Sequence, residues 1–556
     1  MKADGGTLIP LDEDQACAEL EVLRRCGVQG VAICLINAYL NPEHELRLRE
    51  LVAEVLGDVA CSISSDVSPL AKEYPRASTT VIDTFMKIIY SDYTELLDDG
   101  LKKLGFAGQL NFADCAATLV PVDKAMEQPF RIVFSGPSAG TVASAHFGSL
   151  VDEKRLLCAD VGGTSCDISL VTNGVPFVNT TFELEHDLVV NALANDITAI
   201  GAGGGSLVTV GPAGEIRVGP ESAGADPGPV CYGRGGHQPT TTDTCLAVGI
   251  LDGDSFARGQ IHLDRDLALR AFERLESDFP VAQRIRYAYD MAVHNIAEGL
   301  FNVAIKHGVD PRDYTLIAYG AAGPMLLPAV LDTLHCKQVL IPPNPGLFSA
   351  LGLLSADQVF AVNRSDYIVF DRTKADQLNF IFEEMEDQLR SEVGADTSMI
   401  LERSFDGHLV GQSWDTPFVP VPEGRLDGDS VEGLIASFHD TYQTRSGNRF
   451  EQIAVEGVTF RLRAVLDTPK VQYPLIPERG DEPLRPVSST VLNYLDGIDG
   501  ASGAGHDADV YDRSLLCAGD AFDGPAIIKE ELSTTHVCVG QRATVGRFGE
   551  IYVRSQ

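Results

Sequence analysis

The sequence predicts a multidomain α/β protein that ends in a β-rich region, and three observations support this fold class. Strand-like apolar runs alternate with amphipathic helical patterns as far as about residue 370. A glycine-rich hairpin pattern stands at residues 156–171, and short apolar runs separated by turn residues fill 524–554. At 556 residues the chain is too long for one hydrophobic core, so several domains are expected.

The first half of the chain alternates helices and strands in order. Helices are expected over 14–27, 42–56, 78–103 and 138–147, and strands over 30–40, 105–113 and 129–134. Asn41 is a capping residue for the second helix, and Ser135-Gly136-Pro137 should end the last strand. The hairpin strands are Leu156–Ala159 and Ile168–Val171.

The second half continues the pattern and then changes. A strong helical stripe covers 284–307 with Gly308 as its stop, and a strand over 314–319 leads into a glycine loop. Helices over 375–394 and 429–446 bracket strands, and the polar stretch 496–512 is expected to be a connection. The predicted domains are 1–130, 131–372, 373–485 and 486–556.

Composition excludes some classes of function. The chain carries 43 basic and 79 acidic residues, a formal charge of −36, which repels nucleic acid and anionic lipid. An anionic substrate must therefore enter through a locally positive or N–H-lined site.

The apolar runs are too short to span a bilayer, and no leader pattern opens the chain. Twelve scattered cysteines without a CxxC pair predict reduced thiols and a cytoplasmic protein.

The hairpin turn carries the clearest chemical signal, Asp160-Val161-Gly162-Gly163-Thr164 followed by Asp167. Glycines without a Cβ let consecutive N–H groups converge on phosphate oxygens, and threonine adds a hydroxyl. Asp160 and Asp167 are expected to hold Mg²⁺ through water. The turn has no P-loop lysine, and a strand rather than a helix follows it. The alternative interpretation is an ordinary glycine-rich β-turn.

Three further loops accompany this turn. Gly203-Gly204-Gly205-Ser206 permits a close backbone approach, and Gly320 to Gly323 stands between a strand and a helix in a geometry suited to a nucleoside. Residues 218–236 and 240–245 combine glycine and proline with charged residues, which predicts an active-site wall. Its charged members are Glu221, Asp226, Arg234 and Asp243. Taken singly, each loop also fits an ordinary connection between core elements.

In this order, the loops resemble the hydantoinase A / 5-oxoprolinase family. The likeness runs through EYPRASTTVIDTF, FSGPSAG, ADVGGTSCDISLV, IGAGGGS, VGPESAGADPGPVCYGRGG, YGAAGP and IPPNPGLFSALGLL to GPAIIKEELSTT. The resemblance implies ATPase lobes like those of actin, Hsp70 and acetate kinase, with the first lobe incomplete. It also implies a partial family N-terminal domain in 1–130, the ATPase-like domain in 131–372, and an acetophenone carboxylase alpha subunit as an expected relative.

The resemblance assigns ATP and Mg²⁺ as cofactors and gives each loop a role. Asp160, Gly162, Gly163, Thr164 and Asp167 would form the second phosphate loop, with Asp160 and Asp167 as metal ligands. Gly203–Ser206 and Gly320–Pro324 would enclose the nucleotide. Asp160, Asp167, Asp243 and Arg234 are the candidate catalytic residues.

Departures from the family pattern guide the choice of function. The family's first phosphate loop is missing upstream of LIPLDED, so a separate small subunit is expected to supply it. Thr198 and Leu326 stand where the family often has histidine, which removes two possible acid–base groups.

The leading hypothesis is a subunit of a multisubunit ATP-dependent ketone carboxylase, acting on a small-molecule carbonyl substrate. The alternatives are a subunit that opens a hydantoin, oxoproline or lactam ring with a hydantoinase B-like partner, and a degenerate scaffold subunit.

Overall fold

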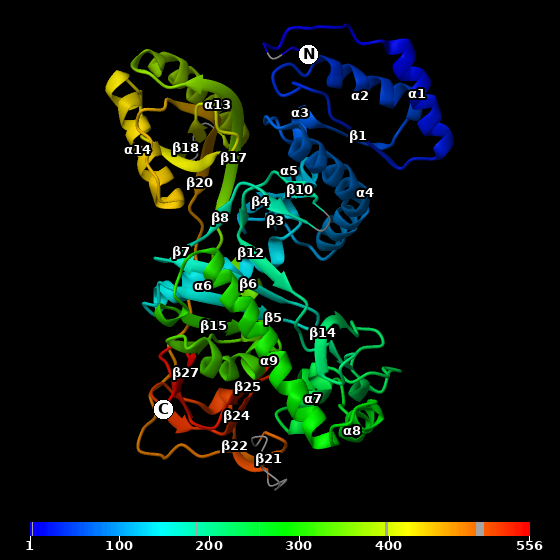
Figure 1. The fold of residues 1–556 in the computed structure, drawn as a ribbon, viewed down its shortest axis with the longest axis vertical. Helices are drawn as coiled ribbons and strands as arrows, with labels where there is room; N and C mark the ends of the chain where they lie inside the picture. The colour runs from blue at the N-terminus through cyan, green and yellow to red at the C-terminus, as the bar shows by residue number, and fades with distance from the viewer. Residues whose placement is uncertain (3, 185–186, 255, 395–397, 496–504) are drawn as a thin grey trace. The chain divides into compact units, whose positions relative to one another are not determined.

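The computed structural model describes residues 1–2, 4–184, 187–254, 256–394, 398–495 and 505–556. These residues form two compact units, each assembled from segments that are far apart in the chain. Unit 1 comprises Met1–Ser135, Val178–Ala194 and Ala356–Pro469, and unit 2 comprises Gly136–Phe177, Asn195–Ser355 and Lys470–Gln556 (Figure 1). The sequence-based division with boundaries near 130, 372 and 485 stays a prediction.

Unit 1 contains a six-stranded sheet with the order β19-β18-β20-β17-β4-β3 and smaller pieces of sheet beside it. Its helices are α1 (Glu13–Cys26), α2 (Glu43–Leu56), α3 (Ser64–Val67), α4 (Glu73–Lys103), α5 (Val122–Glu127), α13 (Ala375–Val393) and α14 (Gly428–Ser446). Its strands are β1 (Gly30–Ile33), β2 (Ala60–Ile63), β3 (Asn111–Ala113), β4 (Leu119–Pro121), β8 (Val178–Asn179), β9 (Phe182–Glu183), β10 (Val189–Val190), β17 (Gln358–Val369), β18 (Ile400–Leu409), β19 (Thr416–Val421) and β20 (Val455–Leu466). Phe382, Phe405 and Phe460 are fully buried between the sheet and its helices.

Unit 2 is built on a mixed sheet with the order β12-β6-β5-β15-β16-β27-β26-β23, to which β7 adds beside β6. Its helices are α6 (Ser135–Leu150), α7 (Thr241–Val248), α8 (Arg265–Arg274), α9 (Val281–Lys306), α10 (Gly323–Leu326), α11 (Leu331–Leu334) and α12 (Phe348–Leu353). Its strands are β5 (Leu156–Val161), β6 (Cys166–Thr172), β7 (Val175–Pro176), β12 (Ile197–Ile200), β13 (Ser206–Val210), β14 (Ile216–Ser222), β15 (Thr315–Tyr319), β16 (Gln338–Ile341), β21 (Ser488–Leu492), β22 (His506–Asp512), β23 (Ala521–Asp523), β24 (Ala526–Lys529), β25 (Thr534–Val537), β26 (Gln541–Val545) and β27 (Ile551–Ser555).

The pairing directions in this sheet decide where the glycine loops emerge. β6 runs antiparallel to both of its neighbours, β12 and β5, whereas β5, β15 and β16 run parallel. Because the ends of parallel strands share one edge, the loops after β5 and β15 lie together. Helix α9 packs its apolar stripe on the sheet, with Ile285, Ile296 and Leu300 buried (Figure 1).

The expected hairpin, the long helices and the β-rich end of the chain are confirmed. The strand expected over 129–134 is wrong. Pro129–Ile132 is a 3₁₀ turn that leads into α6, and a proline at its first position favours helical dihedral angles. The strand expected over 30–40 ends at Ile33, and 105–113 shortens to β3. In the connection expected over 496–512, residues 506–512 form β22, and 496–504 lie outside the described residues.

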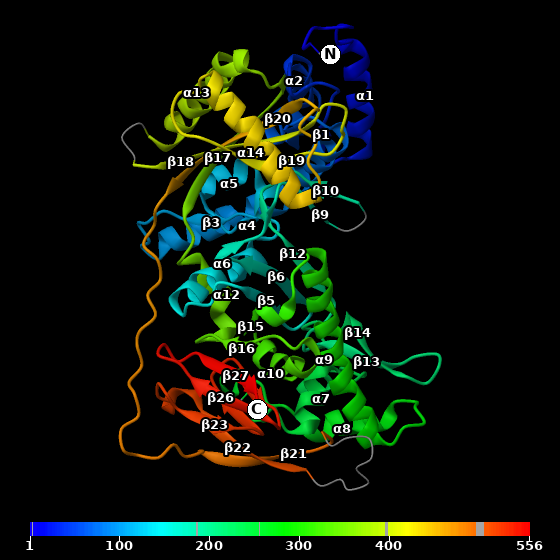
Figure 2. The ribbon, with the colours of Figure 1, turned by 60° about the vertical axis from the view of Figure 1, so that its left-hand side comes forward.

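The C-terminal strands are divided between two sheets. β23, β26 and β27 extend the central sheet of unit 2, whereas β21, β22, β24 and β25 form a four-stranded sheet (Figure 2). The twelve cysteines all lie within the described residues, and none of them is part of a disulfide. Among the described residues, no helix combines the length and the hydropathy that a membrane span requires.

Candidate functional site

The candidate site lies within unit 2, at the turn between β5 and β6. The antiparallel register places Asp160 directly opposite Asp167. The Gly162 N–H donates to the Ser165 carbonyl at 3.0 Å and closes the turn. Gly163 and Thr164 are exposed, and a Cβ on Gly163 would meet no atom within 4 Å. The turn therefore presents bare backbone to its surroundings.

Burial dominates the electrostatics of the two carboxyl groups. It raises the pKa of Asp167 to about 6, and the charge of Asp160 adds to that effect. It also raises the pKa of Asp160, although a hydrogen bond from the Ser349 Oγ, at 2.6 Å, opposes the rise. In the described part of the chain neither carboxylate has an ion-pair partner. When ionised, the pair thus carries negative charge that no positively charged side chain among the described residues offsets.

This donor set suits a small divalent cation. Carboxylate oxygens are hard ligands, and Mg²⁺ typically takes one or two of them and fills its shell with water and phosphate oxygens. No group of three or more His, Cys, Asp or Glu side chains suited to a metal occurs among the described residues. Asp160 and Asp167 therefore fit Mg²⁺ as part of a nucleotide complex better than a cage made only of protein ligands.

The 203–206 loop supports the 162–164 turn through backbone hydrogen bonds. The Gly204 N–H donates to the Gly162 carbonyl at 3.0 Å, and the Gly205 N–H donates to the Gly163 carbonyl at 2.6 Å. A Cβ on Gly203 would lie 2.8 Å from the Gly163 carbonyl. The triple glycine is thus required by close packing, against the turn backbone at Gly203 and Gly205 and against the Thr242 hydroxyl at Gly204. These N–H groups, which the sequence suggested for nucleotide binding, are already bonded to the turn.

Ser206 and the start of α7 hold this second loop in place. The Ser206 Oγ accepts a hydrogen bond from the Gly203 N–H at 2.9 Å. The backbone N–H and the Oγ of Thr242 both donate to the Gly204 carbonyl, at 2.7 and 2.8 Å. The 162–164 turn is therefore hydrogen-bonded to the 203–206 loop, and that loop is hydrogen-bonded in turn to the N-terminal residues of α7.

Asp243 is placed as a structural residue in this stack. Its carboxylate accepts hydrogen bonds from the N–H groups of Val230, Cys231 and Thr240 and from the Thr240 hydroxyl, at 2.7–3.1 Å, and its side chain is fully buried. A carboxylate saturated in this way has no free lone pair for a substrate. We therefore propose a structural role for Asp243, in place of the catalytic role that the sequence suggested.

Among the described residues, Arg234 forms neither a hydrogen bond nor an ion pair with Asp160 or Asp167. The guanidinium stacks over the Tyr232 ring at 5.8 Å, and the side chain is exposed, as are Glu221 and Asp226. No described residue forms an ion pair with Arg234. Its catalytic role stays a prediction.

In the loop after β15, the absence of a side chain at Gly320 leaves space for the Asp160 carboxylate. Gly320 has φ +81°, and a Cβ there would lie 2.4 Å from the Asp160 Oδ1. The Ala322 N–H donates to the Val161 carbonyl at 2.9 Å, which ties this loop to the end of β5. Gly323 is buried at the start of α10, a helix of only four residues. Of the two glycines predicted here, only Gly320 adjoins the carboxylates.

Ser349 and Gly140 belong to the site, although sequence reasoning missed them. Ser349 lies on α12 and holds Asp160 through its hydroxyl. A Cβ on Gly140 of α6 would lie 2.9 Å from the Ser349 Oγ and 2.7 Å from the Tyr319 ring. Both residues stand inside the family-like motifs, but only the fold brings these helices to β5.

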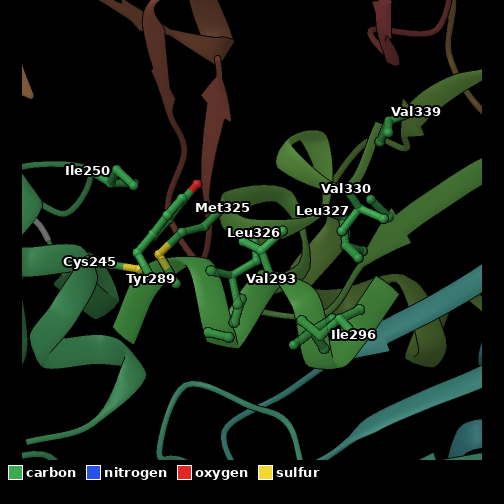
Figure 3. Close-up of a cluster of buried hydrophobic side chains, with 14 of the residues drawn as sticks. Cys245, Ile250, Tyr289, Val293, Ile296, Met325, Leu326, Leu327, Val330 and Val339 are labelled. Carbon is green, nitrogen blue, oxygen red and sulfur yellow. The ribbon is translucent and has the colours of Figure 1, made fainter. Parts of the chain in front are cut away.

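The two positions that lack a histidine differ in setting. Thr198 lies on β12 opposite Ile168. Leu326 is 1% exposed and packs in the apolar cluster that includes Val293 and Met325 (Figure 3). A leucine side chain has no acid–base group, and apolar side chains enclose this one, so the position supplies no such group to the turn.

Two family models match the chain. The hydantoinase/oxoprolinase model matches residues 76–362, and the model of the hydantoinase/oxoprolinase N-terminal region matches residues 1–56.

Three relatives align along nearly the whole chain. An uncharacterized protein of Methanocaldococcus jannaschii is 30% identical over 98% of this chain and 80% of its own length. The caprolactamase subunit alpha of Pseudomonas jessenii is 29% identical over 97% of this chain and 77% of its own length. The acetophenone carboxylase gamma subunit of Aromatoleum aromaticum is 28% identical over 98% and 77%. The subunit of that carboxylase to which this chain is similar here is the gamma subunit, whereas the sequence motifs suggested the alpha subunit.

Two solved structures share the fold. A nucleotide-free acetone carboxylase chain superposes with a TM-score of 0.84 at 23% identity, covering 100% of this chain and 80% of that chain. The ATP-dependent caprolactamase of Pseudomonas jessenii superposes with a TM-score of 0.80 at 26% identity, covering 100% and 81%. The first likeness shows the fold alone.

Proposed function

The chain belongs to the hydantoinase/oxoprolinase family, and from that premise we propose that it is a subunit of an ATP-dependent ketone carboxylase. In this proposal ATP activates a carbonyl or enolate oxygen, or bicarbonate, before a C–C bond forms. The pair Asp160–Asp167 beside the bare turn Gly162–Thr164 is the observation that supports the proposal.

The residues of the turn have distinct roles in this proposal. The exposed backbone N–H groups at Gly163 and Thr164 would bind phosphate oxygens, and the two carboxylates would hold Mg²⁺. When bound, Mg²⁺ neutralises charge on the transferred phosphoryl group. Ser349 orients Asp160, and the braced backbone keeps the N–H groups aligned without reorganisation at the moment of reaction.

The bond changes explain why ATP is consumed. The bond between the γ-phosphorus and its bridging oxygen breaks, ADP leaves, and the acceptor oxygen forms the new bond to phosphorus. On bicarbonate or a carbonyl compound the phosphorylated oxygen is a better leaving group, so the carbon that carries it becomes a stronger electrophile. Inorganic phosphate departs after the carbon nucleophile has formed the new bond. A phosphorylated enolate oxygen instead holds the ketone in its enol form, and loss of phosphate accompanies formation of the C–C bond. In this proposal the Arg234 guanidinium stabilises the charge of the transferred phosphoryl group.

Opening of a cyclic amide is the second candidate. The caprolactamase subunit alpha aligns at 29% identity over 97% of this chain, as strongly as the carboxylase subunit does. The same phosphoryl transfer to a lactam oxygen would serve that reaction. Two of the three relatives are named as subunits, so we propose that this chain also works with other chains, among them a hydantoinase B-like subunit. A small subunit that carries the first phosphate loop stays a prediction.

The test uses the purified assembly with ATP and a panel of ketones and cyclic amides. Incorporation of labelled bicarbonate supports carboxylation, and turnover of a cyclic amide without bicarbonate supports the second candidate. Asp160→Asn should abolish both ATP hydrolysis and product formation. Asp152→Asn, a change on a side chain that is 93% exposed in the same unit, is the matched control. Full activity of Asp160→Asn would leave only the scaffold role.

A further inference from the structure

Helix α4 of unit 1 exposes an apolar face that nothing in the proposed chemistry uses. Between residues 75 and 90 the exposed side chains of the helix are all apolar: Val81 (51% exposed), Phe85 (57%) and Ile89 (49%). Tyr93 and Leu96 continue the face at 55% and 75%. Spacings of three and four residues put these five side chains, here called the α4 stripe, on one side of the helix.

The opposite face of α4 is firmly attached to unit 1. Arg76 is fully buried and donates to the carbonyls of Leu35 and Leu70, at 2.7 and 3.0 Å. Asp83, also fully buried, accepts from the Ser62 hydroxyl at 2.6 Å and pairs with Lys87 at 2.8 Å. Because these bonds fix the rotation of the helix, the stripe cannot turn into the core of unit 1.

Acidic side chains accompany the C-terminal half of the stripe. Asp92, Glu95 and Asp99 are exposed and follow one another at helical spacing. Within the described residues none of them forms an ion pair. Exposed apolar patches bordered by polar residues mark sites of protein association, and aromatic residues contribute most to such sites. The surface that covers the stripe should therefore combine apolar side chains with lysine or arginine.

We propose that the α4 stripe docks a different subunit of the complex, a protein chain that presents an apolar ridge flanked by basic residues. This inference rests on the proposed function for the existence of that partner. A second copy of this chain is the less favourable occupant, because it also carries −36 and would bring the same acidic row against itself. The basic flank distinguishes the proposed partner from such a copy.

The experiment places a photo-crosslinking amino acid, p-benzoylphenylalanine, at position 85 of the full chain in its own cells. Illumination should join the chain to one protein of different sequence, through a segment that contains lysine or arginine. Phe85→Asp should lower the amount of that protein in the purified assembly at least tenfold by native mass spectrometry. Asp92→Lys should lower it severalfold, because it repels the basic flank.

Phe380→Asp is the matched control, since Phe380 is 55% exposed on α13 of the same unit. It should leave the assembly intact. Thermal melting checks that each variant is folded. A cross-link between two copies or within one chain, or an unchanged assembly in Phe85→Asp, would overturn the proposal. Binding of ATP by Phe85→Asp is measured separately, so that failure of docking is distinguished from failure of the nucleotide site in unit 2.

Discussion

At the scale of single residues, the site depends on two carboxyl groups whose charge has no counterion in the described chain. Asp160 and Asp167 face each other across β5 and β6, and burial raises the pKa of both. A protein tolerates such a cost where function needs it. The nucleotide-bound metal is the group that we expect to relieve it.

Replacement of Asp167 by asparagine should stabilise the metal-free protein at neutral pH. With a pKa of about 6 in the folded chain against an unfolded value of 3.8, ionisation lowers the free energy of unfolding as pH rises through that window. The penalty is fully present above about pH 6 and absent below about pH 4. Asp167→Asn should therefore gain of the order of 1 kcal/mol at neutral pH, discounted for partial exposure.

Urea unfolding in chelator, at pH values above and below this window, measures the difference. Asp152→Asn is the control, because its side chain is 93% exposed. An equal gain at both pH values would show that ionisation of Asp167 is not the cause.

Replacement of Asp243 by asparagine should affect folding rather than chemistry. The amide would direct N–H donors toward N–H groups that now donate to the carboxylate, leaving buried donors unsatisfied. The expected loss is about 2–4 kcal/mol of unfolding free energy. Activity per folded molecule should stay close to that of the unchanged protein. A folded Asp243→Asn chain without ATP hydrolysis would restore Asp243 as a catalytic residue.

At the scale of elements, the site is a set of loops stacked on one another by backbone contacts. The 203–206 loop donates to the turn after β5, and the loop after β15 lies against the Asp160 side chain. Small residues are needed where two backbones meet. The glycines of these loops are therefore needed for close packing between the elements, and not only to give a ligand access to the backbone.

Gly320→Ala should be more damaging than the same change at a glycine with free space. At Gly320 the φ of +81° is compounded by a Cβ 2.4 Å from the Asp160 Oδ1. At Gly308 the φ is +64°, but no atom lies within 4 Å of the Cβ. We expect about 1 kcal/mol for Gly308→Ala and about 2–4 kcal/mol for Gly320→Ala.

Urea midpoints of the two variants test this difference, and titration with ATP tests its consequence. Because the Asp160 carboxylate must move in Gly320→Ala, ATP binding should weaken there and not in Gly308→Ala. Equal losses of stability in the two variants would mean that backbone strain alone limits these turns.

At the scale of the whole molecule, the formal charge of −36 opposes the approach of ATP. Raising ionic strength from about 0.01 M to 0.15 M shortens the Debye length from ~30 Å to ~8 Å and screens this repulsion. The association rate of ATP should therefore rise severalfold with salt, opposite to the usual trend for phosphate binding. Stopped-flow kinetics with ATP, and with uncharged adenosine as the control ligand, measures it. A rate that falls with salt would show that a local basic field dominates.

The sequence by itself determined the elements whose signals are local. Alternating apolar runs around Gly162 and Gly163 predicted the hairpin, and the apolar spacing of 284–307 predicted α9, because strand and helix periods depend on near neighbours. The sequence also placed Asp160 and Asp167 at the two ends of the turn region, and the structure pairs them across β5 and β6.

Only the tertiary structure decided what surrounds those carboxylates. Ser349, which is 189 positions away in the chain, donates a hydrogen bond to Asp160. The Asp243 carboxylate accepts hydrogen bonds from backbone N–H groups. The glycines at 203–205 pack against neighbouring residues and do not face open space. The discontinuous units and the exposed face of α4 were equally hidden. Contacts between residues distant in the chain are set by packing, and packing leaves no period in the local sequence.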